Sequence, residues 1–211
     1  MDEPDFRFRL GVIILGAGAS SRMGVPKLLL RWENTTIIAH LVSVWRKIGA
    51  QQIGVVCAPD TPLAPELDRL GVPTDHQIIN PNPERGMFSS IQIAASWNAW
   101  QRDLTHWAIV LGDQPQLTVT TLRTVVAFAL AHRNPICQPA FEGKPRHPVI
   151  LERTAFARLA TTKVITLKEF LHQEQPAPAL CDIDDPSLDT DLDTPADYQA
   201  ALEAADRRVG L

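Results

Sequence analysis

Leu10-Gly-Val-Ile-Ile-Leu-Gly-Ala-Gly-Ala-Ser-Ser-Arg-Met-Gly-Val-Pro-Lys27 is the stretch that decides the fold. The apolar run from Val12 to Leu15 is typical of a fully buried strand. It ends in Gly16 and Gly18, and the small residues here let the backbone approach a ligand closely. Successive free N–H groups in such a loop form a concavity that binds anions such as a polyphosphate. The stretch therefore predicts a strand followed by a nucleotide-binding loop.

Two cations, Arg22 and Lys27, follow the glycines and would supply fixed positive charge to phosphates. A Gly-rich turn with two solvated cations remains an alternative, because an isolated glycine pattern is weak evidence. A dinucleotide-binding fingerprint fits less well, since Pro26 interrupts the helix that should follow it. A Walker-type loop also fits poorly, because the only Gly-Lys pair, Gly143-Lys144, is followed by proline.

The composition is that of an ordinary globular protein. The chain has 211 residues, of which 45% are hydrophobic and 21% charged, and its net charge is −4. This length suits one domain, and the charge argues against a nucleic-acid-coating surface. The apolar run near the N-terminus is too short for a signal peptide or a membrane span, so we expect a cytoplasmic protein without membrane partners. The widely spaced Cys57, Cys137 and Cys181 are expected to be buried small hydrophobes in a reducing compartment.

Apolar strands alternate with amphipathic helices along the chain. This pattern predicts a single-domain α/β protein with a mostly parallel open sheet flanked by helices. Ligands of such sheets bind at the carboxyl ends of the strands. Further strands are expected at residues 52–58, 76–80, 107–111, from 136 and at 147–151, with 180–192 extended. Helices are expected at 37–49, 62–70, 87–101, 118–130, 153–160, 166–173 and from Pro195.

Two acidic segments are candidates for holding a metal ion. Leu111-Gly-Asp113-Gln-Pro115 places a carboxylate directly after a buried strand, where it could bind Mg²⁺ together with water and phosphate oxygens. A turn aspartate explains the same residues equally well. Asp189-Thr-Asp191-Leu-Asp193-Thr-Pro195 precedes the last helix, and ordinary helix capping is favoured there on spacing alone.

Two further segments carry groups suited to anions. Gly86, Ser89 and Ser90 place free N–H groups and hydroxyls at a helix N-terminus, although a plain N-cap explains each serine equally well. His147 follows a turn ending in Arg146, and we interpret it as a positioning residue rather than an acid or base. Arg146 would add charge for an anionic acceptor. The other histidines, at positions 40, 76, 106, 132 and 172, have no ligand spacing and are interpreted as structural or exposed.

The loop Leu15-Gly-Ala-Gly-x-Ser-x-Arg-Met-Gly-x-Pro-Lys-Leu-Leu resembles the signature of the MobA-like nucleotidyltransferases. Its Pro-Lys-Leu-Leu ending is most similar to the molybdenum cofactor cytidylyltransferase branch. The segments at Asn80–Ile91, Asp113–Pro115 and Asp191–Pro195 are similar to later motifs of the family. The resemblance implies a Rossmann-like, GT-A-like fold with a nucleotide half at about residues 8–115 and an acceptor half at about 116–211.

The resemblance also implies roles for individual residues. Lys27 and Arg22 would be the catalytic cations, and Asp113 and Asp193 would hold Mg²⁺, with Asp191 as an open third candidate. Arg146 and His147 would contact the acceptor. The residues expected to bind the nucleotide are Leu15, Gly16, Ala17, Gly18, Ser20, Ser21, Arg22, Lys27, Asn80, Gly86 and Ser90.

The implied reaction is transfer of a nucleotidyl group from a nucleoside triphosphate, with CTP favoured, to a phosphate-bearing acceptor, with molybdopterin as the leading one, and release of pyrophosphate. Transient contact with molybdoenzyme maturation proteins would follow. The family's Gly-Asp-x-Gly-Ala-Arg stretch is replaced here by residues 159–170, so a sugar or polyol phosphate acceptor stays open. A nucleotide-binding protein that has lost catalysis and a dinucleotide-binding oxidoreductase also remain alternatives.

Overall fold

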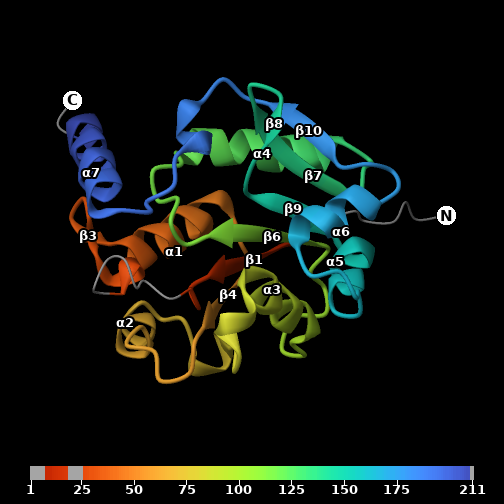
Figure 1. Ribbon diagram of the computed structural model, residues 1–211, viewed down its shortest axis with the longest axis horizontal. Coiled ribbons are helices and arrows are strands. Elements are labelled where there is room, and N and C mark those ends of the chain that lie inside the picture. Colours follow the sequence, from red (N-terminus) through yellow and green to blue (C-terminus); the bar gives the residue numbers. More distant parts are fainter. Residues whose placement is uncertain (1–7, 19–25, 210–211) are drawn as a thin grey trace.

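The central strand β1 (Leu10–Leu15) is buried on both faces, because helices cover both sides of the sheet. Val12 and Ile14 face one apolar cluster, and Ile13 faces another. The computed structural model describes residues 8–18 and 26–209. Within these residues, eight strands form one sheet and two short strands form a separate hairpin (Figure 1).

The strands of the main sheet are β1, β4 (Gln52–Cys57), β5 (Gln77–Ile79), β6 (His106–Leu111), β7 (Ile136–Phe141), β8 (Lys144–Pro145), β9 (Val149–Glu152) and β10 (Ala179–Asp182). Their order is β10-β7-β9-β6-β1-β4-β5, and β8 pairs with β7. β1 is parallel to both β4 and β6, β4 is parallel to β5, and β7 is parallel to β10. β9 is antiparallel to β6 and β7. The expected mostly parallel α/β sheet is confirmed.

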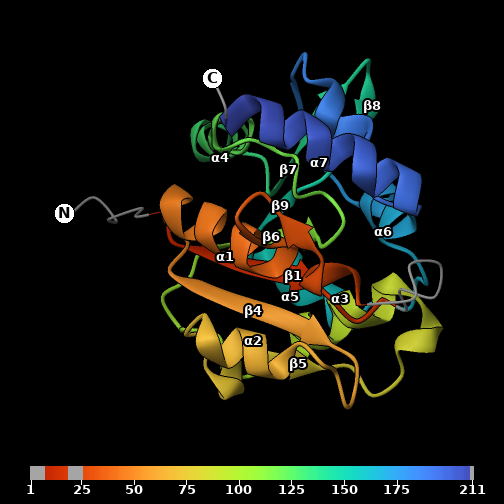
Figure 2. The same ribbon diagram turned by 90° about the vertical axis from the view of Figure 1, so that its left-hand side faces the viewer.

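The helices are α1 (Ile37–Ile48), α2 (Ala64–Arg69), α3 (Met87–Ser96), α4 (Val119–Ala131), α5 (Arg153–Leu159), α6 (Leu167–Gln173) and α7 (Pro195–Val209). Short 3₁₀ turns are η1 (Lys27–Leu29), η2 (Thr74–His76), η3 (Pro83–Arg85) and η4 (Pro186–Asp189), and the hairpin is β2 (Arg31–Trp32) with β3 (Thr35–Thr36). Residues of α1, α4 and α7 pack in one apolar cluster, and residues of α3, α5 and α6 pack in the other. Figure 2 shows α4 and α7 on the same side of the molecule, above α1.

Local sequence signals set several helix ends. The Thr36 side chain accepts a hydrogen bond from the Ala39 N–H and begins α1, and Gly49, with a φ of 104°, ends it. Thr118 caps α4 in the same way through the Thr121 N–H. These caps agree with the sequence, because each is a local interaction within one turn of chain.

Two element boundaries differ from the expectation. The helix expected at residues 87–101 ends at Ser96, since Trp97 is extended and the Trp100 indole donates back to the Ala94 carbonyl at 2.8 Å. The segment at residues 180–192 is extended only to Asp182, because the Asp185 side chain accepts from the Ser187 N–H and starts η4. In both cases a side-chain hydrogen bond turns the chain where the residue pattern alone suggests continuity.

All three cysteines are buried and free of disulfides, as expected. Burial raises the pKa of the Cys57 thiol to about 12 and that of Cys137 to about 11, so both stay protonated at neutral pH. Among the described residues, no helix is long and apolar enough to cross a bilayer.

Candidate active site

The site lies at the edge of the sheet where β1, β4 and β6 end. Parallel pairing aligns Leu15 with Val56 on one side and with Leu111 on the other. Because β9 runs in the opposite direction, the turn before it lies at the same edge, with Val149 opposite Ile109. The loops after β1 and β6 and the turn containing His147 therefore meet there.

Two glycines let the chain close tightly around this edge. The Gly16 N–H donates to the Val56 carbonyl at 2.8 Å. A Cβ at Gly16 would lie 2.8 Å from Leu28 Cδ1 and 3.1 Å from the Val56 oxygen, and one at Gly112 would lie 2.7 Å from the Leu15 carbonyl oxygen. Leu28, which is buried, fits against both glycines. This packing fixes η1 in front of the strand ends and places Lys27 at the site.

The Lys27 ammonium lies between two carboxylates that come from distant parts of the chain. Its Nζ is 3.5 Å from Asp113 Oδ2 and 3.8 Å from Asp193 Oδ1. Lys27 is mostly buried, with 17% of its side chain exposed, whereas Asp193 is 58% exposed. The structure thus brings together three residues that the sequence assigned to one site.

The environment of Asp113 shifts the pKa of its carboxyl upward. Burial raises the pKa of its carboxyl, the Lys27 ammonium opposes that rise, and the nearby Asp191 carboxylate adds to it. The backbone holds the two loops together, since the Leu192 N–H donates to the Asp113 carbonyl at 3.2 Å. A perturbed carboxyl at the end of a strand is typical of a functional site.

Asp191 is tied to the same loop through Gln114. The Gln114 Nε2 donates to Asp191 Oδ1 at 2.9 Å. Asp191 therefore lies near Asp113 and near His147. Its negative charge adds to the rise in the pKa of Asp113, and it partly opposes the lowering of the His147 pKa by burial. Sequence reasoning left Asp191 open and gave Gln114 no role, because the contact joins residues 77 positions apart.

The acidic segment before α7 combines capping with exposed charge. Thr194 and Asp197 form a reciprocal cap: the Thr194 N–H donates to Asp197 Oδ2 at 2.9 Å, and the Asp197 N–H donates to Thr194 Oγ1 at 3.2 Å. These hydrogen bonds lower the pKa of Asp197. Helix capping thus explains Thr194 and Asp197 but leaves Asp193 directed to Lys27.

A buried asparagine holds the loop before α3 in place by hydrogen bonds. Asn80 is fully buried, and its Nδ2 donates to the hydroxyls of Ser89 and Ser90, each at 2.9 Å. Gly86 has a φ of 91° at the N-cap of α3, and a Cβ there would meet no atom within 4 Å. Asn80 and Ser90 therefore shape this loop, and their contact with a nucleotide stays a prediction.

The turn before β9 holds the two predicted acceptor residues. Arg146 forms an ion pair with Asp189 and donates from Nη1 to the Pro145 carbonyl at 3.0 Å. His147 makes a long contact of 3.4 Å from Nδ1 to the Ile109 carbonyl. Burial lowers the pKa of His147, so the neutral ring donates from Nδ1 and keeps the lone pair on Nε2. Such a ring can accept a hydrogen bond from a ligand.

Several predicted nucleotide-binding residues are only partly accounted for. Ser20, Ser21 and Arg22 lie outside the described residues. Leu15 ends β1, Ala17 is buried in the core and a Cβ at Gly18 would meet no atom within 4 Å. Leu15, Gly16, Ala17 and Gly18 thus lead from the strand into the site.

The stretch that replaces the family's acceptor motif has a structural role. Thr166 caps α6 by accepting from the Glu169 N–H at 3.1 Å, and Glu169 in turn accepts from the Ile165 N–H at 3.2 Å. Leu167 and Phe170 are buried in the core. No group of three or more His, Cys, Asp or Glu side chains in residues 8–18 and 26–209 is arranged to hold a metal ion without other ligands.

Comparison with known proteins places this geometry in a family. The model of the MobA-like NTP transferase domain matches residues 12–177. The molybdenum cofactor cytidylyltransferase of Escherichia coli (strain K12) is 27% identical over 193 residues, which cover 90% of this chain and 94% of that protein.

Solved structures show the same fold. Rv0371c from Mycobacterium tuberculosis H37Rv is 26% identical, covers 92% of this chain and 97% of its own, and gives a TM-score of 0.74. Its complex with manganese is 24% identical, with a TM-score of 0.68 over 93% of this chain and 99% of that one. The chain therefore belongs to the family of MobA-like NTP transferase domains.

Proposed function

We propose that this protein transfers a nucleotidyl group from a nucleoside triphosphate, with CTP favoured, to a phosphate-bearing acceptor, and that the acceptor is molybdopterin. The observation that carries the proposal is the convergence of Asp113 and Asp193 on the Lys27 ammonium, beside the loop that follows β1. Membership of the MobA-like family supports the reaction type, and the similarity to the Escherichia coli enzyme supports the cytidylyl group and the pterin.

The two carboxylates suit a divalent cation. One oxygen of each carboxylate lies within 4 Å of the same Lys27 Nζ, and hard oxygen ligands are those that Mg²⁺ prefers. Two protein carboxylates are enough when triphosphate oxygens and water complete the shell. Mg²⁺ held by Asp113 and Asp193 would neutralise charge on the triphosphate. The manganese complex of the mycobacterial relative is in keeping with a divalent ion.

The reaction needs positioning more than acid–base chemistry. An oxygen of the acceptor phosphate would form a bond to the α-phosphorus, and the bond from that phosphorus to the bridging α–β oxygen would break. Pyrophosphate leaves with the electron pair. The attacking phosphate is already ionised at neutral pH, so no strong general base is required. Lys27 and Arg22 would stabilise negative charge on the phosphates.

The acceptor half of the site would be formed by Arg146 and His147. Arg146 supplies positive charge for an anionic group, and the neutral His147 supplies an acceptor nitrogen. Residues 8–115 would then bind mainly the nucleotide and residues 116–211 mainly the acceptor. If the acceptor is molybdopterin, we expect the protein to act in the cytoplasm and to contact molybdoenzyme maturation proteins transiently.

Pyrophosphate release with each of the four ribonucleoside triphosphates, with Mg²⁺, in the presence and absence of molybdopterin tests this proposal. Release with CTP only when pterin is present is the expected result. Pyrophosphate release without pterin, or only with a sugar or polyol phosphate, would show that the acceptor is not molybdopterin. Triphosphate binding without release in any combination would contradict a catalytic function.

A further inference from the structure

The acidic segment before α7, residues 185–193, is joined by hydrogen bonds to the chain that follows β6. At one end of this contact the Thr121 hydroxyl donates to Asp185 Oδ2 at 2.6 Å. At the other end the Leu192 N–H donates to the Asp113 carbonyl at 3.2 Å. The contact therefore sets where the segment with the second candidate metal carboxylate lies relative to the loop with the first.

Gln116 joins the middle of this contact. Its Nε2 donates to the Ser187 carbonyl at 3.1 Å and to the Thr190 carbonyl at 2.6 Å. One amide thus binds the backbone of the η4 turn at two points, and Gln116 itself is only 9% exposed. Buried hydrogen bonds to backbone carbonyls fix the turn whatever the charge of the carboxylates around it.

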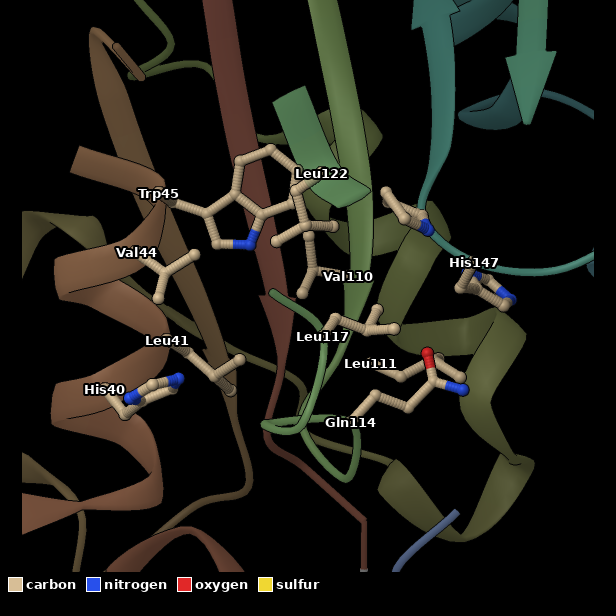
Figure 3. Close-up of a pocket in the computed structure, with 11 residues that line it drawn as sticks. His40, Leu41, Val44, Trp45, Val110, Leu111, Gln114, Leu117, Leu122 and His147 are labelled. Atoms are coloured by element: carbon tan, nitrogen blue, oxygen red, sulfur yellow. The ribbon is translucent and has the colours of Figure 1, made fainter. Parts of the chain in front are cut away.

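The loop that carries Gln116 is in turn anchored in the core. Leu117, the next residue, is buried in the same apolar cluster as α1 and β1. Figure 3 shows Leu117 and Gln114 beside Val110 and Leu111 of β6, with side chains of α1 across the pocket. A loop anchored in this way gives the η4 turn a rigid support.

Asp193 has little support of its own. Its side chain is 58% exposed, its Oδ1 lies 3.8 Å from Lys27 Nζ, and it follows Thr190 by three residues. We infer that Gln116 is a positioning residue, which holds the η4 turn and so keeps the Asp193 carboxylate beside Asp113. Removing a residue that holds a metal ligand in place typically lowers metal affinity by 10- to 100-fold. The consequence for metal binding rests on the proposed function.

Binding of Mn²⁺, measured by electron paramagnetic resonance with the metal alone and with α,β-methylene CTP, tests this role. Gln116→Met keeps most of the side-chain volume but loses both hydrogen bonds. The other contacts of the acidic segment remain, so we expect the Mn²⁺ dissociation constant to rise about tenfold rather than binding to be abolished.

Gln52→Met is the matched control. Gln52 is also buried, and its Nε2 donates to the Ala99 carbonyl at 2.9 Å, but it begins β4 and so lies at the opposite edge of the sheet. Both variants lose an amide donor to the backbone, so urea denaturation should show a loss of stability in each. Only Gln116→Met should bind Mn²⁺ more weakly.

Unchanged Mn²⁺ affinity in Gln116→Met, or equal weakening in Gln52→Met, would reduce Gln116 to a structural role and overturn the inference. If Gln116→Met does not fold, Gln116→Asn, whose amide is one methylene shorter, carries the same expectation. Absence of Mn²⁺ binding by the wild-type protein would also overturn it. If the wild-type protein binds Mn²⁺ but releases no pyrophosphate, and the Gln116 variant still weakens Mn²⁺, the proposed function fails and the positioning role stands.

Discussion

Asp113 is subject to opposing electrostatic effects. Burial favours its neutral form, while the Lys27 ammonium at 3.5 Å favours its charged form. Asp193 is more exposed and is held at 3.8 Å from the same ammonium. A metal ion placed between these carboxylates would satisfy both, and the repulsion between Asp113 and Asp191 would then decrease.

Replacing Asp113 by Asn tests whether this carboxylate holds the metal ion. The change preserves shape but removes the charge, so we expect pyrophosphate release to fall by at least about 100-fold, with folding retained. Asp103→Asn is the control, because that carboxylate pairs with Arg9 at the opposite end of β6. Activity of Asp113→Asn near that of the control would remove Asp113 from the metal site.

A second substitution tests whether the Lys27 ammonium takes part in the reaction. Lys27→Met keeps much of the side-chain length but removes the ammonium, and we expect kcat/KM for the triphosphate to fall by about 10²–10³, because charge on the phosphates loses a preorganised partner. The exposed Lys168→Met on α6 should have no effect. Equal kinetics of the two variants in steady-state assays would exclude a catalytic role for Lys27.

Single residues also show how far the sequence alone can lead. The proximity of Asp113 and Lys27 was predictable, because each lies in a local motif next to the end of one of two neighbouring parallel strands. The contact between Gln114 and Asp191 was not, since it depends on how two loops 77 positions apart face each other. The ion pair of Arg146 with Asp189 likewise depends on tertiary structure.

At the scale of elements, close packing of backbone explains why the strand ends are glycine. Gly16 and Gly112 directly follow β1 and β6, and Leu28 of η1 packs against both glycines. The sequence suggested that Gly16 leaves space for a ligand, whereas the structure shows that its Cβ position is already crowded by Leu28 and Val56. The glycine serves the protein's own packing there.

Gly112→Ala should therefore be destabilising. The added Cβ would lie 2.7 Å from the Leu15 carbonyl oxygen, which belongs to the central strand and cannot move easily. We expect a loss of about 1–3 kcal/mol in the free energy of unfolding, measured by urea denaturation. Gly18→Ala is the matched control, since a Cβ there meets no atom within 4 Å. An equal effect of both substitutions on stability would refute the packing argument.

Helix α7 is fastened to the segment that follows Lys27. The Tyr198 hydroxyl donates to the Arg31 carbonyl at 2.7 Å, and Arg31 pairs with Asp206 at 3.2 Å. Tyr198→Phe removes the hydrogen bond but keeps the ring, and we expect a loss of about 1 kcal/mol in unfolding free energy. Urea denaturation measures this loss, which is small because the Tyr198–Arg31 hydrogen bond is exposed. The control is Gln199→Ala, at the next position of the same helix. An unaltered midpoint in Tyr198→Phe would mean that this hydrogen bond contributes nothing.

The candidate site is formed by four segments that are distant in the sequence. They carry Lys27, Asp113, His147 and Asp193. The alternation of strands and helices was enough to predict a mostly parallel sheet. It was not enough to predict that β9 is antiparallel, because a short apolar strand carries no sign of its direction. That reversal brings His147 to the edge with Asp113, so the segment around His147 is the part whose position sequence patterns describe least.

Buried imidazoles make the stability of the whole protein sensitive to acid. Burial lowers the pKa of His40 and His147, and it lowers that of His106 to about 4. Between pH 6.5 and 4 the unfolded chain binds a proton at His106 that the folded chain does not, so stability falls as the pH falls. Each pKa unit of difference corresponds to about 1.4 kcal/mol, so the lowered pKa of His106 contributes at most about 3.5 kcal/mol to this loss.

His106→Phe isolates this contribution. The ring of His106 stacks on Phe8 with a centroid separation of 4.5 Å, and phenylalanine keeps that stacking without titrating. We expect the unfolding free energy of the wild-type protein, measured by urea denaturation at half-unit steps, to fall more steeply than that of His106→Phe between pH 6.5 and 4. His172→Phe, at an exposed position of α6, should follow the wild-type slope. Parallel curves for wild type and His106→Phe would show that this ring is protonated equally in the folded and unfolded chains.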